Sequence, residues 1–373
     1  MKRISSEYNY GEFFLFGKEL FYYQKLVELL EKKRLQQNFI QIQSPFFYNN
    51  FLWKKTKHWS FYKQNMFVFK KHSLKPMNCP AAMLFVKKVL NSTLRFPIKI
   101  FEIGRVFRNE PRGSLKHDER LISFILDDMH ILVDEFSIKK EISILISDIC
   151  IFYNLFNLSI EFFLSTKPND IVSHNTIWEK STQILKDVLQ QQNIAFSIDC
   201  GEGAFYGPKI DICTKKNEKN VQLATIQLDF FLTKRLDIKI NNVFPVVIHS
   251  ALLGSFERFL AVIRTKSLSF WMYKIPFIII RLTEKVNIIE QKIKNFFDRK
   301  KIEYLIVAGE DVNKILKMYS GQVYSFIFLG NKEVEKKVVT CRFVEKSIEK
   351  KFSLLSFKNF INSEKKKIEK FFI

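Results

Sequence analysis

The sequence predicts an α+β protein in which a mostly antiparallel sheet flanked by helices is followed by a small α/β domain. Short strand-like runs occur up to about residue 250 without regular helices between successive runs. Two long stretches have the periodicity of amphipathic helices, and strand and helix patterns alternate beyond residue 276. We therefore expect a first domain over residues 1–272 and a second over residues 276–373.

Two stretches of the first domain are expected to be helices. Residues 18–35 repeat apolar side chains at the helical spacing, and so does the segment from Asp134 to about Phe156. Asp134 suits the start of the second helix, because an aspartate carboxylate can accept a backbone N–H of the first turn.

Runs rich in apolar and β-branched residues predict the strands. In the first domain they cover residues 39–45, 98–107, 121–126, 194–199, 221–228 and 244–248. In the second domain strands are expected at 277–282, 302–308 and 325–329, with helices at 286–301 and 311–318, which is a βαβ pattern. The lysine-rich run at 364–370 is expected to be the solvated end of a helix.

Composition restricts the kinds of partner and compartment. The formal net charge of +22 favours a polyanion such as nucleic acid, although a coding bias toward lysine explains much of it equally well. The 5 cysteines are odd in number and include no CxxC pair, which favours a reducing compartment. The sequence has no apolar run of the roughly 18 residues that a membrane span needs and no signal-peptide start. We therefore expect a cytoplasmic protein without a membrane partner.

A charged turn follows the strand at 98–107. Arg108 and Glu110 precede the turn, and the returning strand brings Asp128 and His130 beside them. An arginine suits a bidentate grip on a phosphate, and a nearby carboxylate can accept a hydrogen bond from an adenine amino group. A surface ion pair is the alternative and more common explanation of Arg108 and Glu110.

A second motif follows the strand at 244–248. Residues 251–259 are expected to form a helix with Gly254 in its first turn, where a flat ring could approach the backbone closely. Arg258 would then project toward a triphosphate. The alternative is a core helix with an exposed arginine.

These two stretches together resemble motifs 2 and 3 of the class II aminoacyl-tRNA synthetases, and their residues are similar to those of the threonyl-tRNA synthetase family. Three further segments resemble that family in the same order, at residues 75–80, 201–209 and 225–230. The resemblance extends from about Gly11 to the C-terminal helix. It implies the class II fold, with a catalytic domain followed by an anticodon-binding domain.

The resemblance also implies a metal. Cys79, His130 and His249 match the three zinc ligands of the family, although their wide spacing does not itself indicate a metal site. Three nitrogen and sulfur ligands leave a tetrahedral zinc ion open to substrate. The implied site holds one Zn²⁺ per chain, which the amino and hydroxyl groups of L-threonine chelate while Asp128 accepts from the hydroxyl.

The implied reaction activates threonine with ATP and Mg²⁺ and transfers it to tRNA(Thr). Arg108 and Arg258 would be catalytic and hold the phosphates, Glu110 the adenine, and Arg120 the triphosphate tail. Gln222 and Thr225 would complete the ATP site. The amino-acid pocket would be formed by Met77, Asp128, Tyr206, Lys209, Gln227 and Ala251.

The resemblance extends to tRNA recognition and assembly. Glu333 and Arg342 match anticodon-reading positions, and the segment around Pro45 implies a homodimer. Family members usually carry ubiquitin-like and editing domains before the catalytic core, whereas this sequence begins almost at the core. We therefore expect no editing of serine in cis.

Four residues depart from the family pattern and bear on the transfer step. Phe16, Ala82, Leu126 and Ser250 stand where the family usually has histidine, histidine, glutamine and arginine. Two alternative functions stay open, namely another class II synthetase of the prolyl or seryl type and a non-catalytic RNA-binding paralogue. ATP–pyrophosphate exchange that depends on threonine would separate them.

Overall fold

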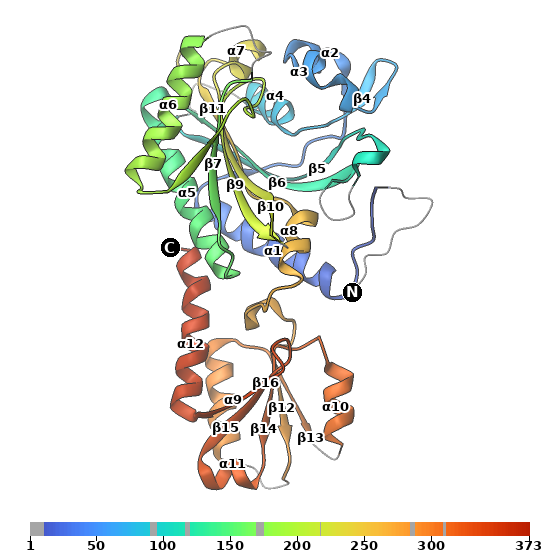
Figure 1. Ribbon diagram of the computed structural model, residues 1–373, viewed down its shortest axis with the longest axis vertical. Coiled ribbons are helices and arrows are strands. Elements are labelled where there is room, and N and C mark those ends of the chain that lie inside the picture. Colours follow the sequence, from blue (N-terminus) through green and yellow to red (C-terminus); the bar gives the residue numbers. More distant parts are fainter. Residues whose placement is uncertain are drawn as a thin grey trace. The chain divides into compact units, whose positions relative to one another are not determined.

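The structure is a computed structural model, and it describes residues 11–89, 95–115, 120–168, 175–216, 218–283, 288–308 and 311–373. The chain forms two compact units (Figure 1). Unit 1 comprises Val27–Val262 with the residues before Phe16, and unit 2 comprises Phe16–Leu26 and Ile263–Ile373. The domain limits expected from the sequence stay a prediction.

Unit 1 is built on an eight-stranded sheet in the order β1-β5-β6-β11-β10-β9-β7-β8. Only the outermost pairs, β1 with β5 and β7 with β8, are parallel. The strands are Ile40–Gln41 (β1), Ile98–Phe107 (β5), Ser123–Val133 (β6), Glu161–Ser165 (β7), Phe196–Asp199 (β8), Lys209–Lys216 (β9), Lys219–Asp229 (β10) and Val246–Ser255 (β11). The predicted α+β class with a mostly antiparallel sheet is confirmed.

Helices α5 (Ile138–Leu155) and α6 (Asn175–Gln191) pack on the sheet (Figure 1). The predicted apolar face of α5 is fully buried, and a buried aliphatic side chain of this kind contributes about 1.5–3 kcal/mol. Asp134 does act as a cap, but it accepts the N–H of Ser137 in a short 3₁₀ turn that precedes α5.

Unit 1 contains further helices and a small sheet. Helix α1 lies where a helix was expected and contributes to both units, α8 overlaps the second half of a predicted helix, and the other elements were not predicted. The helices are α1 (Gly17–Gln36), α2 (Asn50–Lys55), α3 (His58–Tyr62), α4 (Cys79–Val89), α7 (Leu232–Leu236) and α8 (Phe256–Ile263). A three-stranded sheet contains β2 (Phe47–Asn49), β4 (His72–Leu74) and β3 (Val68–Phe69).

The helix predicted over residues 251–259 is wrong in its first half. Strand β11 continues through Ser255, and α8 begins only at Phe256. Gly254 has a left-handed φ of +71°, and a Cβ atom there would lie 2.2 Å from the carbonyl oxygen of Leu223 in β10. Glycine is therefore required by the close approach of two strands rather than by a helical turn.

The strand predicted over residues 39–45 is wrong in length. Only Ile40–Gln41 pairs as a strand, in parallel with β5. The preceding Asn38 has a positive φ of 60°, which turns the chain just before the strand. Farther along, the Ser44 N–H donates to the Glu102 carboxylate at 2.9 Å instead of to the backbone of a neighbouring strand, and Pro45 has no N–H to donate.

Unit 2 contains a five-stranded sheet in the order β13-β12-β14-β15-β16. Its strands are Phe277–Arg281 (β12), Tyr304–Ala308 (β13), Ser325–Leu329 (β14), Val338–Phe343 (β15) and Ile348–Ser353 (β16). The first three are parallel, with helices between them, so the predicted βαβ pattern is confirmed. The helices are α9 (Ile288–Lys300), α10 (Val312–Tyr319), α11 (Asn331–Lys336) and α12 (Leu354–Phe371).

Two further predictions for unit 2 concern the helices α9 and α12. The expected helix start at Val286 and Asn287 lies outside the described residues, and the helix continues as α9. The lysine-rich run at 364–370 lies in α12, as expected.

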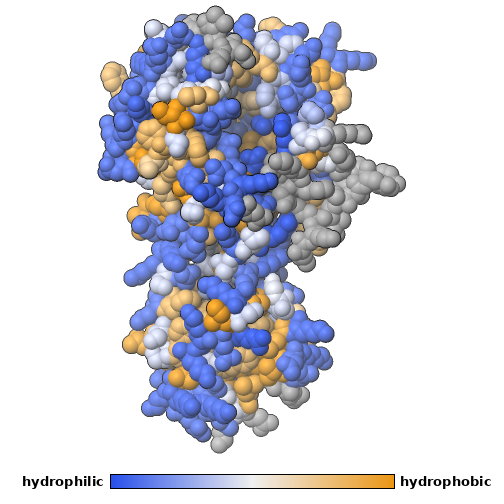
Figure 2. Space-filling model, viewed as in Figure 1, coloured by the Kyte–Doolittle hydropathy of each residue, from blue (hydrophilic) through white to orange (hydrophobic). Residues whose placement is uncertain are grey.

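The face in Figure 2 is mainly hydrophilic, with hydrophobic residues in separate groups. Among the residues that the structure describes, none of the helices has the length and apolar character needed to cross a membrane.

Candidate active site and metal centre

A cavity of about 950 Å³ lies against the middle strands of the unit 1 sheet. Its volume is within the range of about 300–1,000 Å³ that small-molecule sites occupy. All the residues predicted to bind ATP, amino acid or metal line it, namely Met77, Cys79, Arg108, Glu110, Arg120, Asp128, His130, Tyr206, Lys209, Gln222, Thr225, Gln227, His249, Ala251 and Arg258. The fold thus brings these residues to one place, and their individual roles stay predictions.

Strand register explains this convergence. Residues that are direct partners in neighbouring strands point to the same face of a sheet. Two adjacent rows cross β9, β10, β11 and β6 in this way, the first formed by Lys209, Gln227, His249 and His130, and the second by Asp211, Thr225, Ala251 and Asp128. One face of four central strands therefore presents seven of the candidate residues.

Gln222 reaches the same face through a β-bulge. Residues three positions apart point to opposite faces of a regular strand, so Gln222 and Thr225 could not otherwise face the cavity together. The register between β10 and β9 shifts between Gln222 and Ala224, which makes Leu223 an extra residue. The backbone oxygen of Gln222 accepts a hydrogen bond of 2.8 Å from Arg258, so the bulge also positions that arginine.

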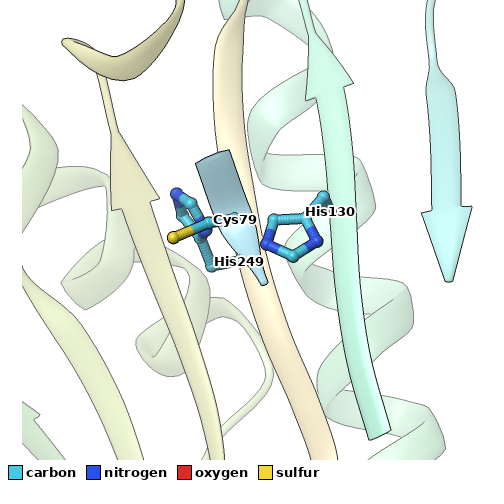
Figure 3. Close-up of side chains that lie close together, drawn as sticks. All are labelled: Cys79, His130 and His249. Carbon is cyan, nitrogen blue, oxygen red and sulfur yellow. The ribbon is translucent and has the colours of Figure 1, made fainter. Parts of the chain in front are cut away.

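Cys79, His130 and His249 form a candidate metal centre (Figure 3). Each offers one ligand atom, and these atoms lie within 4.8 Å of one another. All three residues are buried, and the Nε2 atoms of both histidines have no hydrogen-bond partner among the described residues. Buried polar atoms are normally bonded, so these two nitrogens fit a metal ion. Two imidazoles and a thiolate suit zinc.

Burial also controls the protonation of these ligands. It lowers the pKa of His130 well below the usual value, with a further contribution from His249, so the imidazole is in its neutral, ligating form. Burial raises the pKa of the Cys79 thiol, and the carboxylates of Asp128 and Asp229 raise it further. A bound divalent cation would favour the thiolate and oppose that shift.

Asp128 lies beside the candidate metal centre. Its Oδ1 is 3.8 Å from the His130 Nε2, and its Oδ2 accepts a hydrogen bond of 3.1 Å from Asn78. The side chain of Asn78 lies against Gly104, where a Cβ atom would come within 2.7 Å of it. Asn78 therefore holds Asp128 in place, a contact that the sequence analysis missed because the two residues lie on different elements.

The lining of the cavity also includes arginines. The Arg108 guanidinium lies over the rings of Phe124 and Tyr62, at 4.9 and 5.5 Å from their centroids. The buried carboxylate of Glu110 accepts two hydrogen-bonding contacts from Arg120, at 2.8 and 2.7 Å. Guanidinium groups in such positions can neutralise phosphate oxygens.

Sequence reasoning also missed His58. Its Nε2 lies 3.7 Å from the Cys79 sulfur, and its Nδ1 contacts the Thr56 hydroxyl at 2.8 Å. Burial is the main cause that lowers the pKa of His58 to about 4, so the ring is neutral. His58 stands alone in its segment, and no sequence pattern of the kind used above singles it out.

Of the departures noted in the sequence, Leu126 and Ser250 line the cavity. The Ser250 hydroxyl donates to the Thr225 backbone oxygen at 3.0 Å. Ala82 is buried in α4.

The two predicted anticodon residues lie in unit 2. Glu333 is on α11, and its carboxylate accepts from the Gly330 N–H at 3.1 Å and from the Thr340 hydroxyl at 3.0 Å. Arg342 is exposed on β15. Glu333 therefore stabilises the turn before α11, and the anticodon role of both residues stays a prediction.

Known proteins are similar in sequence to this chain. The probable cytoplasmic threonine–tRNA ligase of Enterocytozoon bieneusi is 33% identical over 97% of this chain and 60% of its own length. The threonine–tRNA ligase of Helicobacter acinonychis is 31% identical over 92% of this chain and 59% of its own length. The chain thus spans about 60% of the length of these curated relatives.

A solved structure and a family profile agree with these relatives. The crystal structure of the RNA binding domain of threonyl-tRNA synthetase from Cryptosporidium parvum matches with a TM-score of 0.79 and 28% identity, over 97% of this chain and 95% of that one. The family described as the tRNA synthetase class II core domain (G, H, P, S and T) matches residues 67–267, more than half of the sequence. The chain therefore belongs to the class II tRNA synthetase family with the core domain of the G, H, P, S and T enzymes.

Proposed function

We propose that the chain acts as a threonine–tRNA ligase. The observation that carries the proposal is the candidate metal centre of Cys79, His130 and His249, in which both histidine Nε2 atoms lack a hydrogen bond to any part of the chain that the structure describes. Asp128 and several arginines line the same cavity. A zinc ion held there, one per chain, would supply open coordination positions for the amino and hydroxyl groups of threonine. Asp128 would accept the hydroxyl hydrogen. The names of the relatives support this amino acid.

The residues of the cavity suit adenylate formation. The threonine carboxylate attacks the α-phosphorus of ATP and pyrophosphate leaves, a reaction that depends on positioning and charge neutralisation more than on a side-chain base. Arg108 and Arg258 would neutralise the phosphate charge that grows during this step. Glu110 would accept from the adenine amino group, and Mg²⁺ would accompany the triphosphate.

The second half of the reaction transfers threonine to the ribose of tRNA(Thr). The net charge of +22 suits an RNA partner. Glu333 and Arg342 are proposed to contact the anticodon. We place this activity in the cytoplasm, because the name of the Enterocytozoon relative describes it as cytoplasmic. Cell fractionation would test that location.

Amino-acid-dependent ATP–pyrophosphate exchange tests the activity. We expect exchange with threonine, with serine weaker by roughly 10- to 200-fold because it lacks one methyl group, and with valine weaker by roughly four to five orders of magnitude because it cannot supply the hydroxyl. A preference for proline or serine would favour another class II synthetase. If none of the amino acids supports exchange but the chain still binds RNA, the non-catalytic alternative would be favoured.

We also propose that the chain forms a homodimer through the segment around Pro45. The residues Phe47, Phe51 and Phe69 are 60, 67 and 52% exposed, and the rings of Phe47 and Phe69 lie 6.2 Å apart. Exposed apolar groups of this kind mark association surfaces. In sedimentation equilibrium we expect a dimer that Phe47→Asp with Phe51→Asp converts to a monomer. A monomeric unaltered chain would contradict the proposal.

A further inference from the structure

A carboxylate behind the cavity connects three of the side chains that line it. Asp211 lies on β9 with its side chain only 9% exposed. Its Oδ2 accepts from the Lys209 ammonium at 2.7 Å and from the Ser165 hydroxyl at 2.9 Å. Its Oδ1 accepts from the Gln222 amide and, at 3.3 Å, from the Thr225 hydroxyl. Lys209, Gln222 and Thr225 line the cavity, whereas Asp211 does not.

The register of the sheet places Asp211 at the centre of this group. Thr225 in β10 is its direct cross-strand partner, and Lys209 lies two residues earlier on the same face. The bulge at Leu223 brings Gln222 to that face as well. Ser165 approaches from β7, on the other side of β9. Side chains from three strands therefore meet at one carboxylate.

The Asp211 carboxylate is well suited to hold its neighbours in fixed orientations. An ionised carboxylate offers about four acceptor sites, and four donors occupy them here. A buried charge is stable only when it is paired and hydrogen-bonded, and Lys209 supplies the opposite charge. Each donor is thereby held in one orientation, which reduces the freedom that ligand binding would otherwise have to remove.

We propose that Asp211 is a positioning residue, which fixes Lys209, Gln222 and Thr225 in the orientations that bind ATP and the amino acid. The inference rests on the proposed function, because it takes these two molecules as the ligands. Asp211 acts on the adenosine side through Gln222 and Thr225 and on the amino-acid side through Lys209. Loss of the Asp211 charge would therefore weaken the binding of both ATP and the amino acid, although Asp211 contacts neither ligand.

The test compares Asp211→Asn with Asp187→Asn. Asp187 is a matched control, because this partly exposed carboxylate accepts from Lys139 and Gln183 away from the cavity. In threonine-dependent exchange we expect Asp211→Asn to raise the KM for ATP and the KM for threonine by about tenfold each, the effect of losing charge-assisted hydrogen bonds that orient binding groups. Asp187→Asn should leave both KM values and the zinc content as in the unaltered protein.

A merely structural role would give a different result. It would reduce the fraction of folded, active enzyme, and with it the apparent kcat, while both KM values stayed unchanged. Unchanged KM values in folded Asp211→Asn would overturn the inference, provided that the unaltered chain shows threonine-dependent exchange. Absence of exchange in the unaltered chain would instead contradict the proposed function.

A second pair of variants covers the case in which Asp211→Asn does not fold because Lys209 is left as a partly buried charge without its partner. Lys209→Met alone is compared with Lys209→Met combined with Asp211→Asn, so that no unpaired charge remains. The combined variant should have a KM for ATP several-fold above that of Lys209→Met, because Gln222 and Thr225 lose their anchor. Equal KM values for ATP in the two variants would overturn the inference.

Discussion

Cys79→Ser is expected to lower threonine-dependent exchange by more than about a hundredfold, since changes at the outer-shell partners of a zinc site alone can cost 10- to 100-fold. The thiolate is one of three ligand atoms within 4.8 Å of one another, and a serine hydroxyl is a poor substitute for it. ATP binding should be largely retained, because Cys79 is not among the residues proposed to hold ATP. Elemental analysis and exchange kinetics together measure the effect.

Cys150→Ser is the control for this variant. Cys150 is a half-buried cysteine on α5 and does not line the cavity. The Cys150→Ser variant should keep both its zinc content and its exchange activity. Full threonine-dependent exchange by a zinc-free preparation of the unaltered protein would refute the metal assignment.

Arg258→Ala and Arg108→Ala are each expected to lower the rate of threonine activation by roughly two orders of magnitude or more, the scale of a lost electrostatic donor. Both guanidinium groups line the cavity, and Arg258 is tied to the Gln222 backbone. The effect should appear mainly in kcat, because the phosphate charge grows as pyrophosphate leaves. Zinc content and threonine binding should be retained, as measured by elemental analysis and calorimetry.

Arg105→Ala, which removes a cation three residues before Arg108, is the control and should leave kcat near normal. Arg105 lies on β5, donates to the Ser123 hydroxyl at 2.8 Å and does not line the cavity. Near-normal kcat in both the Arg258 and Arg108 variants would show that these arginines serve structure alone, as in a surface ion pair.

The sequence allowed the fold class to be predicted, and the family resemblance named residues that line the cavity, but neither showed how these residues meet. Periodicity is a local property, so α5 and the βαβ unit were recognised from their own residues. The pairing of His130 with His249 depends on which strands become neighbours and in what register, and neither is encoded in one segment. The same holds for Asp211 and His58, whose significance comes from contacts with distant residues.

Gly254 also shows that a local sequence pattern does not reveal which distant residues come into contact. It was singled out as a position that needs glycine, but it was placed in a helical turn, whereas it lies in strand β11. A glycine after a strand is compatible with both a helical turn and a close strand contact, and only the position of the Leu223 carbonyl decides between them.

The extra residue in β10 makes the number of residues in this strand as important as their chemical identity. Side chains alternate between the two faces of a regular strand, so residues three positions apart, such as Gln222 and Thr225, would point to opposite faces. The bulge residue Leu223 brings both side chains to the same face. Removing Leu223 would turn one of these two side chains toward the face of the sheet that α5 covers. At this point of the chain, a conservative substitution is a smaller change than a deletion of any single residue.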